Sequence, residues 1–160
     1  MRAPLEPEVT ALFLKITETG DLEPEDEICK RVLSIHDHWL SEEEARFMLS
    51  FSTLRSWPDY RHYLKEEDKF VVLFSALFQE GDIFYFEHSD DTVVPLESWQ
   101  QLVARTTTGL REKQHFLFYV RRFRLLLVSA YDLNVAVYFL APQHQAAFAD
   151  RAQKCRLHLL

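Results

Sequence analysis

The sequence predicts a single α+β domain, in which N-terminal helices precede a mostly antiparallel sheet of about five strands that packs against helices, with a helix at the C-terminus. Three observations predict it. A chain of 160 residues is long enough to bury one core. Its composition is 48% hydrophobic and 14% aromatic, unlike that of a disordered chain. Apolar residues recur at helical spacing in residues 1–67, whereas residues 68–160 read as β-β-α-β-β-β-α.

The first predicted helix has one apolar face and a clear end. Val9, Leu12, Phe13 and Ile16 form that face. Their spacing is the i, i+3, i+4, i+7 pattern of an amphipathic helix. Gly20 follows, and glycine is the residue that most often ends a helix.

Two more helices are predicted between residues 24 and 51. Pro24 suits a first turn, and the acidic residues after it complement the helix dipole. The face of this second helix, which ends near residue 40, consists of Ile28, Val32, Ile35 and Trp39. Ser41 and Glu44 then form a capping box, which opens a third helix. We expect Trp39 to be buried, and Ala45, Met48 and either Phe47 or Phe51 to point inward.

Residues 52–69 are polar and are interrupted at Trp57-Pro58, which predicts a loop with at most a helical turn. Strands are expected from residue 70. Residues 70–78 and 83–86 are rich in aromatic and β-branched residues, and residues 79–82 between them have turn chemistry, so together they predict a β-hairpin. A further strand is expected within residues 92–94.

The last third of the chain alternates between helix and strand patterns. Pro95 starts a helix that closes before Gly109 and buries Trp99 together with Leu102. Strands are predicted over residues 115–121, 123–130 and 135–141, with a turn at 131–134. Pro142 ends the last strand, and residues 143–160 form a closing helix through Phe148, Ala152, Cys155 and Leu159.

The order of elements predicted over residues 70–160 is similar to that of profilin-like folds of the roadblock and longin kind. In those folds a five-stranded antiparallel sheet packs against helices and serves as a docking surface. The resemblance implies a scaffold that pairs with a homologous domain through a sheet edge and its terminal helix. It rests on the order of elements, and no residue role is carried over from it.

Several features favour a soluble, cytoplasmic protein with no membrane partner. The apolar runs are shorter than the roughly 20 residues that span a bilayer. The N-terminus has no apolar stretch followed by a signal cleavage site. Cys29 and Cys155 are the only cysteines and belong to no CxxC pair, which fits a reducing compartment.

Motifs for catalysis, cofactors and metals are weak or absent, and we expect no catalytic residue, cofactor or metal site. Three glycines cannot supply a P-loop or a GxGxxG turn, and no GxSxG elbow occurs. The tripeptide 36–38, His-Asp-His, resembles metal ligands, but i and i+2 residues of a helix point apart. Asp59, Glu67 and Lys69 imitate a nuclease PD…ExK motif in a segment too short for a strand to turn back.

The charge is uneven along the chain, whose formal net charge is −7. Residues 1–110 contain 22 acidic and 10 basic residues, and residues 111–160 contain 3 acidic and 8 basic ones. The acidic part favours a basic protein partner and disfavours nucleic acid, which needs a broad basic face. The residues expected to bind the partner are Glu25, Asp26, Glu42, Glu43, Trp57, Asp59, Glu66, Glu67, Asp90 and Asp91.

One basic cluster stands out against this acidic background. It comprises Arg111, Lys113, Arg121, Arg122 and Arg124, interleaved with aromatic residues. Two interpretations remain open: an ion-paired sheet edge protected from aggregation, and a surface for protein binding or self-association. Basic and aromatic residues together can also bind single-stranded nucleic acid, which the acidity of the remaining chain disfavours.

These observations lead to a hypothesis about function. We expect a non-catalytic protein-binding domain, most concretely a small acidic cytoplasmic inhibitor of the immunity-protein or antitoxin type that neutralises a basic protein. The first alternative is a roadblock- or longin-like scaffold subunit of a multiprotein complex, which would form a homodimer. The second is a metal-dependent hydrolase that uses residues 36–38.

Overall fold

The computed structural model describes residues 5–23, 27–80 and 83–160. The described helices are α1 (Pro7–Thr19), α2 (Glu42–Ala45), α3 (Trp57–Glu80), α4 (Trp99–Leu110) and α5 (Gln145–Lys154). The described strands are β1 (Cys29–Ser34), β2 (Ile83–Glu87), β3 (Thr92–Pro95), β4 (Leu117–Val120), β5 (Leu125–Ser129), β6 (Asn134–Phe139) and β7 (His158–Leu159). The predicted α+β class is confirmed, and the sheet has seven strands where about five were expected.

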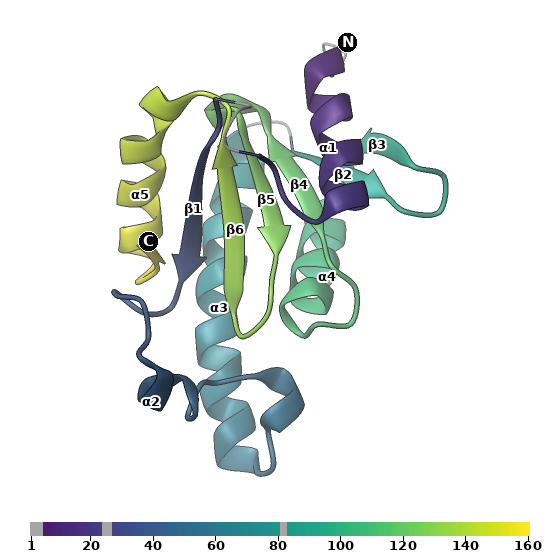
Figure 1. The fold of residues 1–160 in the computed structure, drawn as a ribbon. Helices are drawn as coiled ribbons and strands as arrows, with labels where there is room; N and C mark the ends of the chain where they lie inside the picture. The colour runs from purple at the N-terminus through teal and green to yellow at the C-terminus, as the bar shows by residue number, and fades with distance from the viewer. Residues whose placement is uncertain (1–4, 24–26, 81–82) are drawn as a thin grey trace.

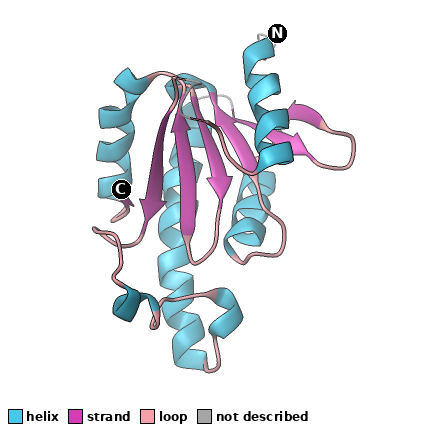
Figure 2. Cartoon of the chain, in the orientation of Figure 1, coloured by secondary structure: helices cyan, strands magenta, loops and turns pink. Residues whose placement is uncertain are grey.

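All neighbouring strands of the sheet are antiparallel, in the order β3-β2-β4-β5-β6-β1-β7. Helix α1 lies across one face, and α3, α4 and α5 cover the other (Figures 1 and 2). Both edges are short, because β3 has four residues and β7 has two. None of the helices in the described part of the chain combines the length and the apolar character that crossing a bilayer requires.

Alternating residues of the strands point into two separate hydrophobic clusters. Phe118, Val120 and Leu127 pack against α3, α4 and α5 in the larger cluster. Leu117 and Tyr119, their neighbours in β4, face α1, where Phe13 stacks on Phe86 with ring centroids 6.1 Å apart. The period of two along each strand therefore supplies side chains to both layers of helices. The predicted N-terminal helix is confirmed, with Gly20 in the left-handed conformation at its end.

Helix α3 occupies residues for which the sequence predicts a loop and a strand, and both predictions were wrong. Its buried residues Tyr63, Glu67, Phe70, Phe74 and Leu77 are spaced by three or four positions, as one face of a helix requires. The β-branched and aromatic residues of segment 70–78 lower helix propensity by less than about 1 kcal/mol each. Burial of a whole helical face outweighs that preference. The turn predicted at residues 79–82 lies partly outside the described residues.

Strand β1 replaces the second predicted helix, so that prediction was also wrong. It pairs with β6 from Cys29↔Phe139 to Ser34↔Asn134, and β7 pairs with its other side. Hydrogen bonds to strands about 100 or more residues later stabilise this conformation, and local periodicity cannot reveal them. The proposed start at Pro24 lies outside the described residues. Trp39 lies beyond the strand and is 68% exposed, contrary to the expected burial.

The third predicted helix is present but much shorter than expected. The capping box is confirmed, yet α2 ends at Ala45, so Phe47 is 86% exposed instead of pointing inward. Phe51 begins a 3-10 turn (Phe51–Thr53) and packs edge-on against Tyr63, with ring centroids 5.3 Å apart. Of Phe47 and Phe51, it is therefore Phe51 that points inward.

Helices α4 and α5 exist where expected but with different ends. Pro95 closes β3, and Ser98 caps α4, whose last turn contains Gly109. Trp99 is about half exposed and donates its indole N–H to Ser75 Oγ, contrary to the expected burial. Helix α5 stops at Lys154, and the chain reverses at Arg156 (φ +59°) to form β7, where the sequence predicts helix to residue 160.

Candidate functional site

Residues 36–60, which we call the aromatic end, connect β1 to α3 and continue into the first turn of α3. This segment and the first half of α3 extend beyond the end of the sheet (Figure 1). Three large aromatic side chains are exposed there: Trp39 at 68%, Phe47 at 86% and Trp57 at 65%. Single exposed apolar residues are normal on protein surfaces, and three exposed aromatic ones within one short segment make this segment a candidate site.

Short-range hydrogen bonds hold the middle of the aromatic end in place. Ser41 Oγ accepts from the Glu44 N–H at 3.2 Å, and Glu44 Oε2 accepts from the Ser41 N–H at 2.8 Å. His38 contacts Glu44 Oε1 through Nε2 at 3.0 Å and Asp37 Oδ1 through Nδ1 at 2.6 Å. The His38 ring thus links the chain after β1 to α2.

Charge in this network follows from its hydrogen bonds. Asp37 and then Glu44 raise the pKa of His38, because both carboxylates favour its charged form. The Ser41 backbone N–H, followed by His38, lowers the pKa of Glu44 to about 2. Glu44 is therefore ionised at neutral pH, and His38 keeps its proton to higher pH than an isolated histidine does.

Acidic residues outnumber basic ones in the aromatic end. Residues 36–60 contain five carboxylates and two arginines. Of the residues expected to bind a partner, Glu42, Glu43, Trp57 and Asp59 belong to this segment, and all four are exposed. Beside Trp57 lies a shallow cavity of about 490 Å³, lined by Phe51, Leu54, Arg55, Ser56, Trp57 and Tyr60. The segment thus joins exposed rings, negative charge and a recess.

The other expected partner-binding residues lie elsewhere. Asp90 and Asp91 are exposed in the turn between β2 and β3, away from the aromatic end (Figure 1). Glu66 is half-buried and forms an ion pair with Lys69. Glu25 and Asp26 fall outside the described residues. The structure therefore brings only part of the expected set together.

Glu67, expected at the surface, is buried and holds Arg111. Its two carboxylate oxygens accept from Arg111 Nε at 2.8 Å and from Arg111 Nη2 at 2.6 Å. This bidentate hydrogen bond raises the pKa of Arg111. Asp59 and Glu67 are eight residues apart on α3, about 12 Å along its axis, too far to hold one ion. The described residues include no group of three or more His, Cys, Asp or Glu side chains placed to bind a metal.

The basic cluster predicted from sequence does not form one surface. Arg111 lies at the end of α4 beside Glu67, whereas Arg121 and Arg124 lie near the start of α1. Arg124 Nη2 is 3.0 Å from a Glu8 carboxylate oxygen, and Arg121 Nε is 3.9 Å from Glu6 Oε2. Of the two open interpretations, these contacts agree with ion pairing for Arg121 and Arg124.

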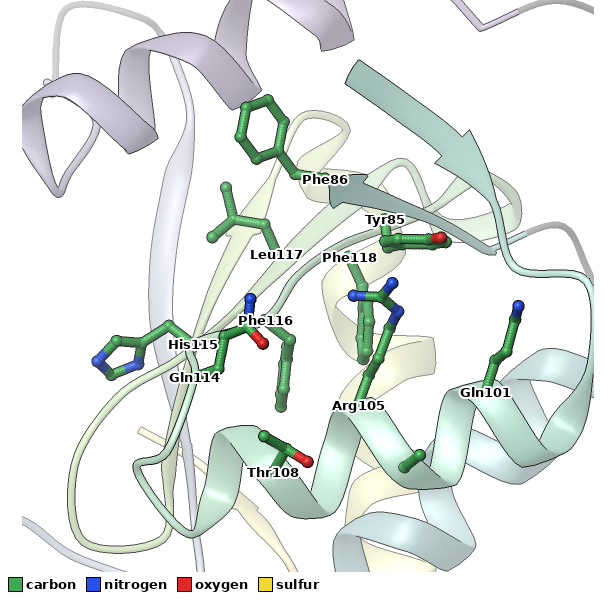
Figure 3. A pocket seen from close by; sticks show the side chains of 11 residues that line it. Tyr85, Phe86, Gln101, Arg105, Thr108, Gln114, His115, Phe116, Leu117 and Phe118 are labelled. Carbon is green, nitrogen blue, oxygen red and sulfur yellow. The ribbon is translucent and has the colours of Figure 1, made fainter. Parts of the chain in front are cut away.

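A second hollow lies between α4 and the strands, and none of its residues was among the predicted site residues (Figure 3). It has a volume of about 310 Å³ and contains Arg105, whose guanidinium carbon is 3.6 Å from the centroid of the Tyr85 ring. Arg105 Nη2 also donates to Glu87 Oε2 at 2.9 Å. The sequence pattern that could have predicted this hollow is the spacing of Gln101, Arg105 and Thr108, which places three polar side chains on one side of a helix.

The cysteines show no sign of nucleophilic chemistry. Burial raises the pKa of the Cys155 thiol, which disfavours the thiolate that reactions require. Cys29 Sγ lies 3.3 Å from Gln145 Oε1, so it contributes to the contact between β1 and α5. Comparison of the chain with protein-family models, with curated proteins and with solved structures finds no match.

Proposed function

We propose that this protein is a non-catalytic binding domain that docks onto a basic protein through its aromatic end. In its most concrete form it is a cytoplasmic inhibitor of the immunity-protein or antitoxin type. The observation that carries the proposal is the exposure of Trp39, Phe47 and Trp57 on a segment with excess negative charge. Aromatic side chains dominate the energetics of protein interfaces.

Electrostatics supports a basic partner in particular. Glu42 and Glu43 are exposed on α2, and Asp59 is exposed in the first turn of α3. Their charges accelerate association with a cationic surface and select against acidic proteins. The recess beside Trp57 offers a place for an apolar or cationic side chain of the partner. Neither the acidic residues nor the recess requires a catalytic role for this surface.

The scaffold alternative depends on the edges of the sheet. Strand β3 is short and ends in Pro95, and β7 contains two residues. Such edges offer few backbone groups for pairing with a second chain. Size-exclusion chromatography with light scattering distinguishes the alternatives, because the scaffold is a dimer by itself and the inhibitor is a monomer without its target.

The test is affinity capture from native cells, followed by binding measurements with the captured protein in purified form. We expect a basic protein that is lost at high salt. Phe47→Ala and Trp57→Ala should each weaken binding by about tenfold or more, as loss of an interface anchor does. Glu42→Gln/Glu43→Gln should mainly slow association.

Tyr131→Ala is the matched control, since this ring is 63% exposed outside the aromatic end. It should leave affinity unchanged. Equal affinity of the Phe47 and Trp57 variants and the unmodified protein would show that the aromatic end is not the docking surface. Binding that is insensitive to salt would exclude steering by acidic residues.

A further inference from the structure

The cavity beneath β2 and β4 arises because these two strands separate. Their pairing runs from Ile83↔Val120 to Tyr85↔Phe118 and goes no further. Beyond that point β2 is still paired with β3, and β4 is still paired with β5. Helix α4 lies below the gap, and Arg105 extends from it toward the strands (Figure 3). The hollow is therefore part of the fold.

One wall of this cavity is aromatic and tightly fixed. The rings of Phe116 and Phe118 are stacked with centroids 4.4 Å apart and planes 6° apart, and Phe74 packs edge-on against both. Gly109 lets the Phe116 ring approach α4, since a Cβ atom there would be 2.4 Å from Phe116 Cδ1. Phe118 is fully buried and Phe116 is 4% exposed, so these rings close the cavity on this side and present to it little more than an edge of Phe116.

The polar side of the cavity is centred on Arg105. Its guanidinium lies flat against Tyr85, and Glu87 holds Nη2, so its orientation is determined from two sides. Among the side chains that the structure describes, Glu87 is the acceptor for Arg105, and it contacts neither Nε nor Nη1. The Gln114 amide points into the same space, whereas the His115 ring points away (Figure 3). A half-buried arginine fixed in this way is suited to a carboxylate.

We infer that this cavity binds a small organic acid. The carboxylate contacts the remaining N–H groups of Arg105, and the apolar part of the acid lies beside Tyr85 and the edge of Phe116. The cavity volume, about 310 Å³, is within the range of small-molecule sites, which combine mostly apolar walls with a few placed polar groups. The inference concerns binding alone and does not depend on the proposed protein partner.

Two aromatic acids, benzoate and indole-3-carboxylate, serve as probes in a titration followed by two-dimensional NMR. The neutral amides benzamide and indole-3-carboxamide have nearly the same shapes. We expect saturable shifts of the Arg105 Nε resonance and of backbone amides 114–118 with an acid, and binding of the amides that is weaker by about tenfold or more. Arg105→Gln should weaken binding of the acid by a similar factor, because the charge is lost.

Ala104→Phe tests the cavity while retaining Arg105. Ala104 is exposed at the opening, so a larger side chain blocks entry without disturbing the core. It should abolish binding, whereas Ala147→Phe at an exposed position of α5 should not. Equal binding of acids and amides, full binding by Ala104→Phe, or no saturation by either acid up to about 20 mM would overturn the inference.

The residues whose NMR resonances shift also show which of two neighbouring cavities binds the acid. The other cavity has a volume of about 430 Å³, lies beside the end of α1, and includes Val128 and Ala136 in its lining. Both cavities include His115 and Leu117 in their lining, but only the first includes Arg105 and Phe118. Shifts centred on Val128 and Ala136, with the Arg105 Nε resonance and the Phe118 amide unaffected, would place the acid in the other cavity and also overturn the inference.

Discussion

At the scale of single residues, Gly109 shows how the absence of a side chain can shape a site. It lies in the last turn of α4, where Phe116 Cδ1 and Ser129 Oγ would be 2.4 Å and 3.1 Å from a Cβ atom. Ser129 Oγ accepts from the Phe116 N–H at 2.9 Å, which fixes the backbone beside this contact. The ring therefore has little room to move, and glycine sets the distance between α4 and β4.

We predict that Gly109→Ala destabilises the protein by about 1–3 kcal/mol, the usual result of overpacking a core. The free energy of unfolding in urea measures this. The double variant Gly109→Ala/Phe116→Leu should lose less stability than the sum of the two single variants, because a smaller residue at 116 makes room for the methyl group.

Gly20→Ala is the control for this double-mutant comparison. Gly20 has φ +80°, and no atom lies within 4 Å of the place that a Cβ atom would take, so its substitution costs backbone strain alone. Phe116→Leu should not relieve that strain. Strict additivity of Gly109→Ala with Phe116→Leu would show that the two residues do not press on one another.

At the scale of elements, the short helix α2 depends on its first turn more than on its length. Four residues form too few hydrogen bonds for a stable isolated helix, so the capping box and His38 have a large share in its order. Because the His38 pKa is raised, protonated His38 stabilises the folded state below its unfolded pKa of about 6.5. That stabilisation is lost as pH rises through the folded pKa.

Glu44 has the opposite dependence on pH. Its pKa is lowered to about 2, so its contribution is present above its unfolded value of about 4.3 and is lost as pH falls toward 2. The stabilisation from both groups is therefore fully present between about pH 4.3 and 6.5. Both side chains are solvent-exposed, and salt weakens their interaction.

We predict that Glu44→Gln lowers the pKa of His38, since it removes one of the two carboxylates that raise it. An NMR titration of the His38 ring measures the change. His62→Gln is a control that should leave the His38 pKa unchanged, because His62 lies on α3 and approaches Glu66 instead. An unaltered His38 pKa in Glu44→Gln would mean that the contact does not persist in solution.

At the scale of the whole molecule, one sheet joins two hydrophobic clusters. Phe13 is fully buried between α1 and the sheet, and Phe148 is fully buried between α5 and the opposite face. Adjacent residues of the same strands serve both clusters. Loss of either cluster therefore weakens a structural element that the other one requires.

We predict a single cooperative unfolding transition, in which Phe13→Ala and Phe148→Ala each lower the free energy of unfolding by about 3–5 kcal/mol. Circular dichroism and tryptophan fluorescence should report coincident curves. Leu14→Ala is the control on α1, because Leu14 is 39% exposed and its loss should cost little. Two separate transitions in Phe13→Ala would show that the two clusters are not coupled.

Local sequence patterns were sufficient where local interactions dominate. The stripe from Val9 to Ile16 ending at Gly20, and the capping box of Ser41 and Glu44, involve only neighbours in the chain. The strand patterns of residues 83–86 and 135–141 were also read correctly, because alternation or continuous burial survives in any antiparallel sheet. These elements establish the α+β class.

By itself, the sequence determined the class, the terminal position of α1, most strands of the sheet and the excess of acidic residues. Only the tertiary structure decided that residues 29–34 form a strand, since their pairing partners in β6 lie about 100 residues away. It also exposed Trp39 and Phe47, buried Glu67 against Arg111, and placed Arg105 under Tyr85. The pairing of β1 with β6, the contact of Glu67 with Arg111 and that of Arg105 with Tyr85 all join segments distant in the sequence, which local propensity does not report.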